Sequence, residues 1–166
     1  MEKFFEEALV EAKKALAKNE IPVGAIVVKD GVIIGRGHNT TESDHDTTAH
    51  AEMNAIREAS KYLGDTLGWR RLTGCDMYVT MEPCSMCAGA LVWSRIENLY
   101  IGVKDPKAGG CGSVLNIIQE EKFNHHVNLI ELGDGPLKDE CRDIIQNFFR
   151  DLREKQKKAK LEETEK

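Results

Sequence analysis

Residues 76–103, DMYVTMEPCSMCAGALVWSRIENLYIGV, contain the part of the chain that decides the fold. The run 76–80 is short, apolar and rich in strand-forming residues, and 96–103 has the same character, so both predict strands. Between them, 83–93 predicts a helix, because Pro83 stands in a first helical turn, where a missing N–H costs nothing. Strands and helices that alternate in this way are typical of a layered α/β domain.

The residues before this segment continue the alternation. Apolar residues at helical spacing predict an amphipathic helix over 2–18. Two apolar, β-branched runs that flank Asp30-Gly31 predict a hairpin. After a polar loop, residues 49–62 predict a second helix, with Thr47 or Thr48 as its expected N-cap.

The residues after the segment predict a short helix over 114–120, a last strand over 127–132 and a final helix from Leu137 to about residue 158. The gap between the strand that ends near 103 and the last strand is longer than the dozen residues that a parallel crossover needs. It also contains a helix. We therefore expect the last strand to run parallel to its predecessor.

Length and composition point to one globular domain. A chain of 166 residues, 41% of them apolar, favours a single buried core, which we expect over residues 1–158. We expect 159–166 to form a flexible charged tail. Charges interrupt every apolar run before it reaches the length of a signal peptide or a membrane span, so we expect a soluble cytoplasmic protein with no membrane partner. Five cysteines, an odd number, argue against a disulfide framework.

The net charge of −5 is unevenly distributed. Taken alone it argues against nucleic acid as a partner, because proteins that bind phosphates carry basic surfaces. However, residues 150–160 carry a net charge of +4, while the first 149 residues carry −7. This basic segment is either a solvated helix end or a stripe that binds RNA phosphates.

Four residues carry the chemistry: His50, Glu52, Cys84 and Cys87. The cysteines form a C-x-x-C at a predicted helix start, so both thiols lie on one helical face and can reach one ion. The helix N-terminus also favours the thiolate, which is the form that binds metal. His50 opens another predicted helix, and three soft or borderline ligands suit zinc.

Three protein ligands leave a tetrahedral ion with one open position, as in catalytic zinc sites, where a water occupies it. Glu52, two residues from a ligand, can face that water as a proton carrier. Taken alone, the C-x-x-C fits a redox pair or half of a closed structural zinc site equally well. The joint pattern, H-A-E at 50–52 and P-C-S-M-C at 83–87, matches the signature of zinc nucleobase deaminases. Cys111 is expected to be a buried thiol rather than a fourth ligand.

The whole chain resembles the family of bacterial tRNA-specific adenosine deaminases, within the zinc-dependent cytidine and deoxycytidylate deaminase-like superfamily. The resemblance covers about residues 4–155. It rests on VGAIVV, GRGHN, TAHAEMNAI, MEPCSMCAGALVWSRI, GVKDPKAGGCGS, FNHHV and FFRDLR. The DPKAGGCGS loop and the FFR-type final helix discriminate most, because related deaminases of free bases share the zinc residues.

The resemblance implies a three-layer α/β/α fold with a five-stranded mixed sheet, and a homodimer with one zinc ion per chain. It also implies a tRNA anticodon stem-loop, that of an arginine tRNA, as substrate, with the wobble adenosine converted to inosine. His50, Cys84 and Cys87 would hold the zinc and Glu52 would move protons. The resemblance assigns contacts with the RNA to Asn39, Asp105, Lys107, Asn124 and Phe149.

Two alternatives stay open on the sequence alone. A zinc-dependent deaminase of a free base or nucleoside, such as guanine or cytosine, shares every zinc residue but does not need the DPKAGGCGS loop or a basic final helix. A zinc-stabilised RNA-binding module without catalysis would close the metal site with a fourth protein ligand.

Overall fold

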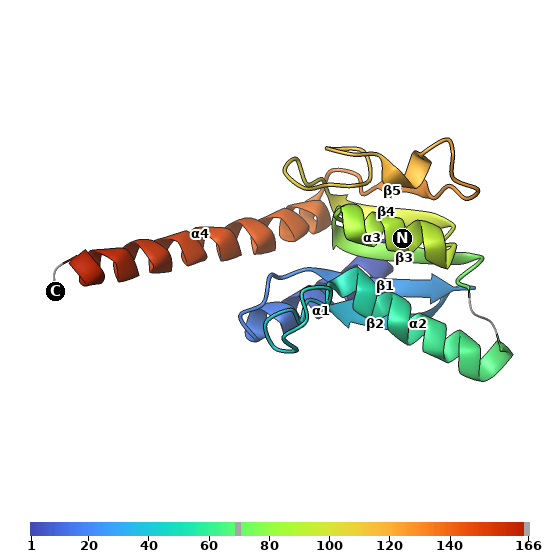
Figure 1. The fold of residues 1–166 in the computed structure, drawn as a ribbon, viewed down its shortest axis with the longest axis horizontal. Coiled ribbons are helices and arrows are strands. Elements are labelled where there is room, and N and C mark those ends of the chain that lie inside the picture. The colour runs from blue at the N-terminus through green and yellow to red at the C-terminus, as the bar shows by residue number, and fades with distance from the viewer. Residues whose placement is uncertain (69–70, 165–166) are drawn as a thin grey trace.

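A computed structural model of the chain describes residues 1–68 and 71–164 (Figure 1). A five-stranded sheet with the order β2-β1-β3-β4-β5 lies between two layers of helices. The strands are β1 (Gly24–Lys29), β2 (Val32–His38), β3 (Cys75–Met81), β4 (Asn98–Val103) and β5 (Asn128–Glu131). The helices are α1 (Glu2–Ala17), α2 (Ala51–Leu67), α3 (Ser85–Ser94), the 3₁₀ turn η1 (Ile117–Gln119) and α4 (Pro136–Thr164).

The sheet is mixed in direction. β1 runs antiparallel to both β2 and β3, whereas β3, β4 and β5 are parallel to one another, which confirms the predicted direction of the last strand. The hairpin between β1 and β2 is also confirmed. Asp30 and Gly31 have φ angles of 49° and 78°, so both occupy the left-handed region that a tight two-residue hairpin turn requires.

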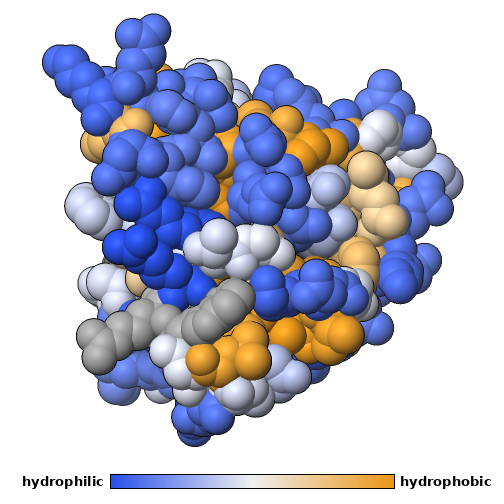
Figure 2. Space-filling view, turned by 90° about the vertical axis from the view of Figure 1, so that its right-hand side faces the viewer, coloured by the Kyte–Doolittle hydropathy of each residue, from blue (hydrophilic) through white to orange (hydrophobic). Residues whose placement is uncertain are grey.

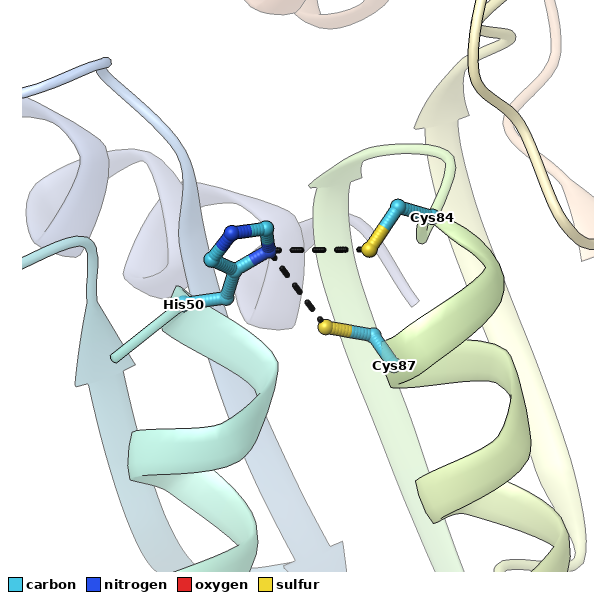
Figure 3. A group of neighbouring side chains, drawn as sticks. All are labelled: His50, Cys84 and Cys87. Atoms are coloured by element: carbon cyan, nitrogen blue, oxygen red, sulfur yellow. Dashed lines mark hydrogen bonds between the residues drawn. The ribbon is translucent and has the colours of Figure 1, made fainter. Parts of the chain in front are cut away.

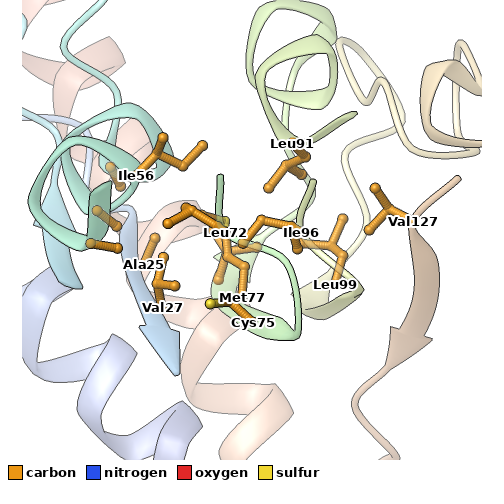
Figure 4. Close-up of a cluster of buried hydrophobic side chains, with 14 of the residues drawn as sticks. Ala25, Val27, Ile56, Leu72, Cys75, Met77, Leu91, Ile96, Leu99 and Val127 are labelled. Carbon is orange, nitrogen blue, oxygen red and sulfur yellow. The ribbon is translucent and has the colours of Figure 1, made fainter. Parts of the chain in front are cut away.

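Helices cover both faces of the sheet. On one face, α2, α3 and η1 bury the larger apolar core, in which Val27, Met77, Leu91 and Leu99 pack together (Figure 4). On the other face, α1 and the first turns of α4 cover a smaller cluster built around Tyr78. The ring of Tyr78 stacks on that of Tyr100 with centroids 4.2 Å apart. These two cores fix the carboxyl ends of β3 and β4 relative to the start of α2.

Two details of the helices differ from the predictions. The expected N-cap of the second helix is wrong: α2 begins after His50, not after Thr47 or Thr48. Thr48 instead donates its N–H and its hydroxyl to Asp46 within the preceding loop. The short helix expected over 114–120 is reduced to the single turn η1, because the glycine-rich segment before it makes its own turns.

The final helix α4 is longer than predicted, continuing to Thr164 instead of ending near 158. Its first turns pack on β4, and its later turns project from the body of the molecule (Figure 1). Every side chain from Arg150 to Glu162 is exposed. Residues 165 and 166 of the expected tail lie outside the described residues, and among the described helices none is long and apolar enough to cross a membrane.

Candidate metal centre and active site

The N-termini of α2 and α3 converge on one small cluster of side chains, formed by His50, Cys84 and Cys87 (Figure 3). His50 immediately precedes α2, Cys84 immediately precedes α3, and Cys87 lies in the first turn of α3. The two helix starts are held together because β1 pairs directly with β3, which leads into Cys84. Two motifs about 35 residues apart in the sequence thus meet at one point.

The spacing of the three donor atoms fits a tetrahedral zinc ion. Nδ1 of His50 lies 3.6 Å from the sulfur of Cys84 and 3.6 Å from that of Cys87. Zinc–sulfur bonds of about 2.3 Å and zinc–nitrogen bonds of about 2.0 Å at tetrahedral angles separate such atoms by about 3.5 Å. Cys111 is buried nearby, but the metal-binding group found among the described residues consists of these three side chains.

Without a metal, the two thiols of the cluster hold their protons with very different strength. A hydrogen bond from Cys87, together with His50, lowers the pKa of the Cys84 thiol to about 3. The pKa of Cys87 is raised far above its usual range by the Cys84 thiolate and by burial. The hydrogen bond with Cys84 raises the pKa of His50. Cys84 is therefore the thiolate of the metal-free cluster, and metal binding must displace a proton from Cys87.

Glu52 lies in the first turn of α2 and is 3% exposed. Burial, reinforced by the negative charge of Cys84, raises the pKa of its carboxyl group to about 7. A group with a pKa near the working pH can both accept and donate a proton, as a general acid–base catalyst must. It lies two residues after His50 and lines the same cleft as His50 and Cys84.

Asn39 occupies the floor of the cleft and also supports α2. Its Oδ1 accepts a hydrogen bond of 2.8 Å from the backbone N–H of Ala51, the first residue of the helix. This contact satisfies one of the N–H groups that a helix start leaves unpaired, as the predicted threonine cap would have done. With Oδ1 engaged, the Nδ2 group is the part of the side chain that can serve a ligand.

A cleft of about 1040 Å³ leads from Glu52 and the metal cluster to α4. One wall is the segment after β4, and the opposite wall contains Ile21 and Thr41. Basic side chains predominate on the wall formed by α4 and the segment after β4: Lys104, Lys107, Lys138, Arg142, Arg150 and Arg153. A cleft of this charge suits a ligand with several phosphates.

Three of the remaining predicted residues line this cleft: Asp105, Lys107 and Phe149. Asp105 Oδ1 accepts a hydrogen bond from the N–H of Lys107, so the two residues form a turn that directs this part of the wall. Phe149 is half-buried and packs edge-on against Phe148, with ring centroids 5.5 Å apart. A partly exposed ring on the wall of a basic cleft is a surface on which a base can stack.

Asn124, in contrast, does not line the cleft. It is exposed in the loop before β5, next to His125, whose Nε2 lies 2.6 Å from the carbonyl oxygen of Ile96. Ile96 precedes β4, so this loop lies at the amino ends of the parallel strands, whereas the metal cluster lies at their carboxyl ends. Figure 2 views this end of the molecule and shows a largely hydrophilic surface with smaller apolar patches.

Two buried carboxylates were missed from the sequence: Glu82, which lines the cleft, and Glu20, which does not; they are 4% and 1% exposed. Glu20 accepts hydrogen bonds from the loop after β2, including the N–H and hydroxyl of Ser43. Glu82 accepts hydrogen bonds from the loop after β4. Each is an isolated acidic residue with an apolar residue after it, and this pattern does not reveal hydrogen-bond partners that lie about 20 residues away.

Comparison with known proteins shows the family to which the chain belongs. Its residues 1–103 match the family described as the cytidine and deoxycytidylate deaminase zinc-binding region. The chain is 48% identical to the tRNA-specific adenosine deaminase of Bacillus subtilis over 96% of this chain and 94% of that protein. It is 47% identical to the enzyme of the same name from Aquifex aeolicus, over 92% and 95% of the two chains. A solved structure from studies of A-to-I editing by tRNA:A34 deaminases at the wobble position of transfer RNA superimposes with a TM-score of 0.76. That protein is 41% identical, and the match covers 86% of this chain and 98% of the other.

Proposed function

This chain belongs to the cytidine and deoxycytidylate deaminase family and, within it, to the tRNA-specific adenosine deaminases. From that premise we propose that it hydrolyses the wobble adenosine of a tRNA anticodon to inosine. The observation that carries the proposal is the position of the zinc-type cluster at the inner end of a long basic cleft. A pocket for a free base would need the cluster but not the basic wall that extends to α4.

The donor set and the family make zinc the cofactor, with His50, Cys84 and Cys87 as its proposed ligands. When bound, zinc supplies Lewis acidity that brings the pKa of a water at its open position close to neutrality. The thiolates and the imidazole would hold the ion at the N-termini of two helices. The open side of this cluster faces the cleft, where the substrate enters.

Glu52 is the proposed catalytic residue. Its carboxylate takes a proton from the attacking water and delivers it to a ring nitrogen of the adenine. The oxygen of the water bonds to C6, which becomes tetrahedral. Glu52 then carries the remaining proton of that oxygen to N6, the C6–N6 bond breaks, and the amino group leaves as ammonia while the oxygen becomes the C6 carbonyl. The pKa of about 7 lets Glu52 act in both directions during one turnover.

The rest of the cleft supplies contacts to the RNA. The Nδ2 group of Asn39 is proposed to donate a hydrogen bond to the flipped adenine, because Oδ1 is already engaged with Ala51. Lys107 and Asp105 are proposed to contact the target nucleotide from the loop after β4. Phe149 is proposed to stack on a neighbouring base, and the basic residues of α4 to contact phosphates.

We also propose that the enzyme is a homodimer. The outer face of α3 carries Met86, Gly89, Ala90 and Trp93, which recur at helical spacing; the first three are partly buried and Trp93 is 77% exposed. A helix that is apolar on all sides normally lies in a protein interior, so this face requires a cover. A second copy of the chain would provide it. Dimer formation would also bring Asn124, which is remote from the cleft of its own chain, toward the cleft of the other subunit.

The dimer proposal has its own test. Trp93→Glu places a charge in the centre of the proposed interface and is expected to yield monomers in sedimentation velocity experiments, whereas the wild type sediments as a dimer. Leu67→Glu, at an exposed apolar position at the end of α2, serves as the matched control. A wild-type protein that sediments as a monomer would contradict the proposal.

The deaminase activity is tested by incubating the zinc-loaded protein with an arginine tRNA anticodon stem-loop, with stem-loops of other tRNAs and with free nucleosides. Mass spectrometry then detects loss of the amino group. We expect inosine at the wobble position of the arginine stem-loop, and essentially unchanged free adenosine. Activity on free guanine or cytidine without activity on RNA would instead support a free-base enzyme. We also propose that the substrate is an arginine tRNA and that the protein is cytoplasmic. Sequencing of cellular tRNA for inosine tests the first proposal, and cell fractionation tests the second.

A further inference from the structure

The buried carboxylate of Glu82 accepts four hydrogen bonds from the loop that follows β4 and forms one wall of the cleft. Oε2 accepts a hydrogen bond of 3.0 Å from the N–H of Asp105 and a second from the hydroxyl of Ser113. Oε1 accepts from the N–H groups of Cys111 and Ser113, at 3.0 and 3.1 Å. One carboxylate therefore holds both the beginning and the end of the loop that joins β4 to η1.

The same loop packs directly on the segment that carries Cys84. Gly110 donates its N–H to the carbonyl oxygen of Pro83, and Gly109 forms an isolated β-bridge with Cys84. A Cβ atom at Gly109 would collide with the carboxyl group of Glu82, and one at Gly110 would lie 2.9 Å from the backbone of Cys84 and Ser85. The glycines thus permit the close approach that the carboxylate then fixes.

The part of the loop that faces the cleft contains Asp105 and Lys107. Its internal ties are short-range: Gly109 donates to the carbonyl oxygen of Asp105, and Lys107 donates to the side chain of Asp105. These bonds define the turn but do not attach it to the sheet. The turn is attached to the body at both of its ends: the hydrogen bond from Asp105 to Glu82 holds its start, and the contacts of Gly109 and Gly110 with Cys84 and Pro83 hold its end.

We propose that Glu82 is a positioning residue, which fixes the loop 104–113 as a wall of the cleft and thereby presents Asp105 and Lys107 to the RNA. The proposal rests on the proposed function, because the RNA is what the wall would contact. Glu82 is 4% exposed at the edge of the cleft, and both of its carboxylate oxygens are engaged by the loop, so it acts through the loop. Its removal should loosen the loop and weaken RNA binding while the metal centre, which is held by α2 and α3, keeps its ion.

Glu82→Gln tests this directly. The amide has the same shape, but its NH₂ group cannot accept a hydrogen bond, so one of the two pairs of loop donors loses its acceptor. We expect backbone amides of 104–113 to exchange with deuterium about tenfold faster than in the wild type. We expect KM for the stem-loop to rise about tenfold with kcat within about threefold, because substrate contact is lost and chemistry is not. The zinc content should stay at one ion per chain.

Glu20→Gln is the matched control, because Glu20 is an equally buried carboxylate that holds the loop after β2. It should speed exchange around Ser43 and leave that of 104–113 unchanged. Ser113→Ala removes one of the four donors and should give a smaller change in the same direction as Glu82→Gln. If Glu82→Gln fails to fold, Glu82→Asp, which keeps the charge on a shorter side chain, should show the same rise in KM.

Wild-type exchange over 104–113 in Glu82→Gln would overturn the proposal, as would a fall in kcat at unchanged KM. The exchange measurement uses the protein without RNA. If the wild type failed to deaminate the stem-loop, the proposed function would therefore fail, while the anchoring of the loop by Glu82 would still be judged on its own.

Discussion

The buried carboxylate of Glu11, on α1, lies 3.0 Å from Nδ1 of His38, the last residue of β2. Lys14 lies 2.7 Å from the other carboxylate oxygen, so a charged group that is 2% exposed holds α1 against the strand that leads to Asn39. Burial alone would raise the pKa of Glu11, but the hydrogen bonds from Lys14 and His38 outweigh it and hold the pKa below its usual value.

This arrangement predicts a defined acid sensitivity. A carboxyl group with a lowered pKa in the folded state stabilises the fold above its unfolded pKa of about 4.3, and the stabilisation is lost as the pH falls through the folded pKa. Glu11→Gln should lower the free energy of unfolding by about 1.5–3 kcal/mol at pH 7, and the difference from wild type should shrink below about pH 4. Urea unfolding at a series of pH values measures both. A difference that stays constant down to pH 3 would show that the charge of Glu11 has no part in it.

Asn39 is predicted to have two separable roles. Asn39→Ala removes the acceptor for Ala51 and should lower the free energy of unfolding by about 1–2 kcal/mol. Asn39→Asp keeps an acceptor at the start of α2 and should stay close to wild-type stability. Both variants lack the Nδ2 donor and should lose at least about tenfold in kcat/KM on the stem-loop. Wild-type kcat/KM in Asn39→Asp would remove Asn39 from the contacts with the base.

Glu52→Ala is predicted to abolish turnover and keep the metal. Loss of a general acid–base group lowers kcat by at least about a hundredfold, whereas the three proposed ligands remain in place. Zinc analysis and single-turnover assays on the stem-loop provide the two readouts. Glu58→Gln, on the same helix but outside the cleft, should retain wild-type turnover. Loss of zinc from Glu52→Ala would mean that the carboxylate serves the metal site instead.

Removal of the metal should expose one reactive thiol. Cys84 is half-exposed and its pKa is lowered to about 3, so the chelated protein should present a thiolate there. Cys75, Cys111 and Cys141 are buried, with thiol pKa values raised by burial. A maleimide should therefore label Cys84 rapidly after chelation and slowly in the zinc-loaded protein, as peptide mapping would show. Equal labelling with and without zinc would contradict the proposed ligand set.

The projecting end of α4 is predicted to serve RNA binding and not stability. Deletion of residues 155–166 removes five lysines, four of which (Lys155, Lys157, Lys158 and Lys160) have side chains that are exposed in the free protein. The Kd for the stem-loop should rise about threefold to tenfold at low salt, and the difference should narrow as salt increases. The melting temperature and zinc content should match those of the full chain. An unchanged Kd at low salt would favour the solvated helix end over the basic stripe.

The sequence was most informative where periodicity and turn chemistry act locally. Asp30-Gly31 predicted the hairpin, the length of the connection after residue 103 predicted the parallel last strand, and the H-A-E and P-C-S-M-C motifs predicted the metal cluster. The turn and the two motifs are each read from a few consecutive residues, and the length of the connection is read directly from the chain. The predicted threonine N-cap of α2 was wrong because the residue that does the capping is distant in sequence. The first N–H of the helix is satisfied by Asn39, which is 12 residues away in sequence, so the nearby threonines were free to bond elsewhere.

Contacts between residues that are distant in sequence also explain why Glu82 was missed from the sequence. Glu82 is joined to loop residues 23 to 31 positions further along the chain, and no spacing rule announces such a contact. Asn124 shows the converse. The resemblance assigned it a contact with RNA, but the topology of one chain places it at the opposite end of β4 and β5 from the metal cluster. The arrangement of the strands shows which residues can reach the cleft of their own subunit and which could reach only the cleft of a second subunit.

The packing of Gly109 and Gly110 against Glu82 and Cys84 also divides the loop into parts with different tolerance to mutation. A side chain at either glycine would strike the anchor or the ligand segment, so random substitution there should be selected against strongly. Pro106, Lys107 and Ala108 face the cleft without such contacts, and their side chains can change while the metal centre is preserved. Under the proposed function, substrate preference could therefore drift, or be redirected by directed evolution, through three neighbouring codons.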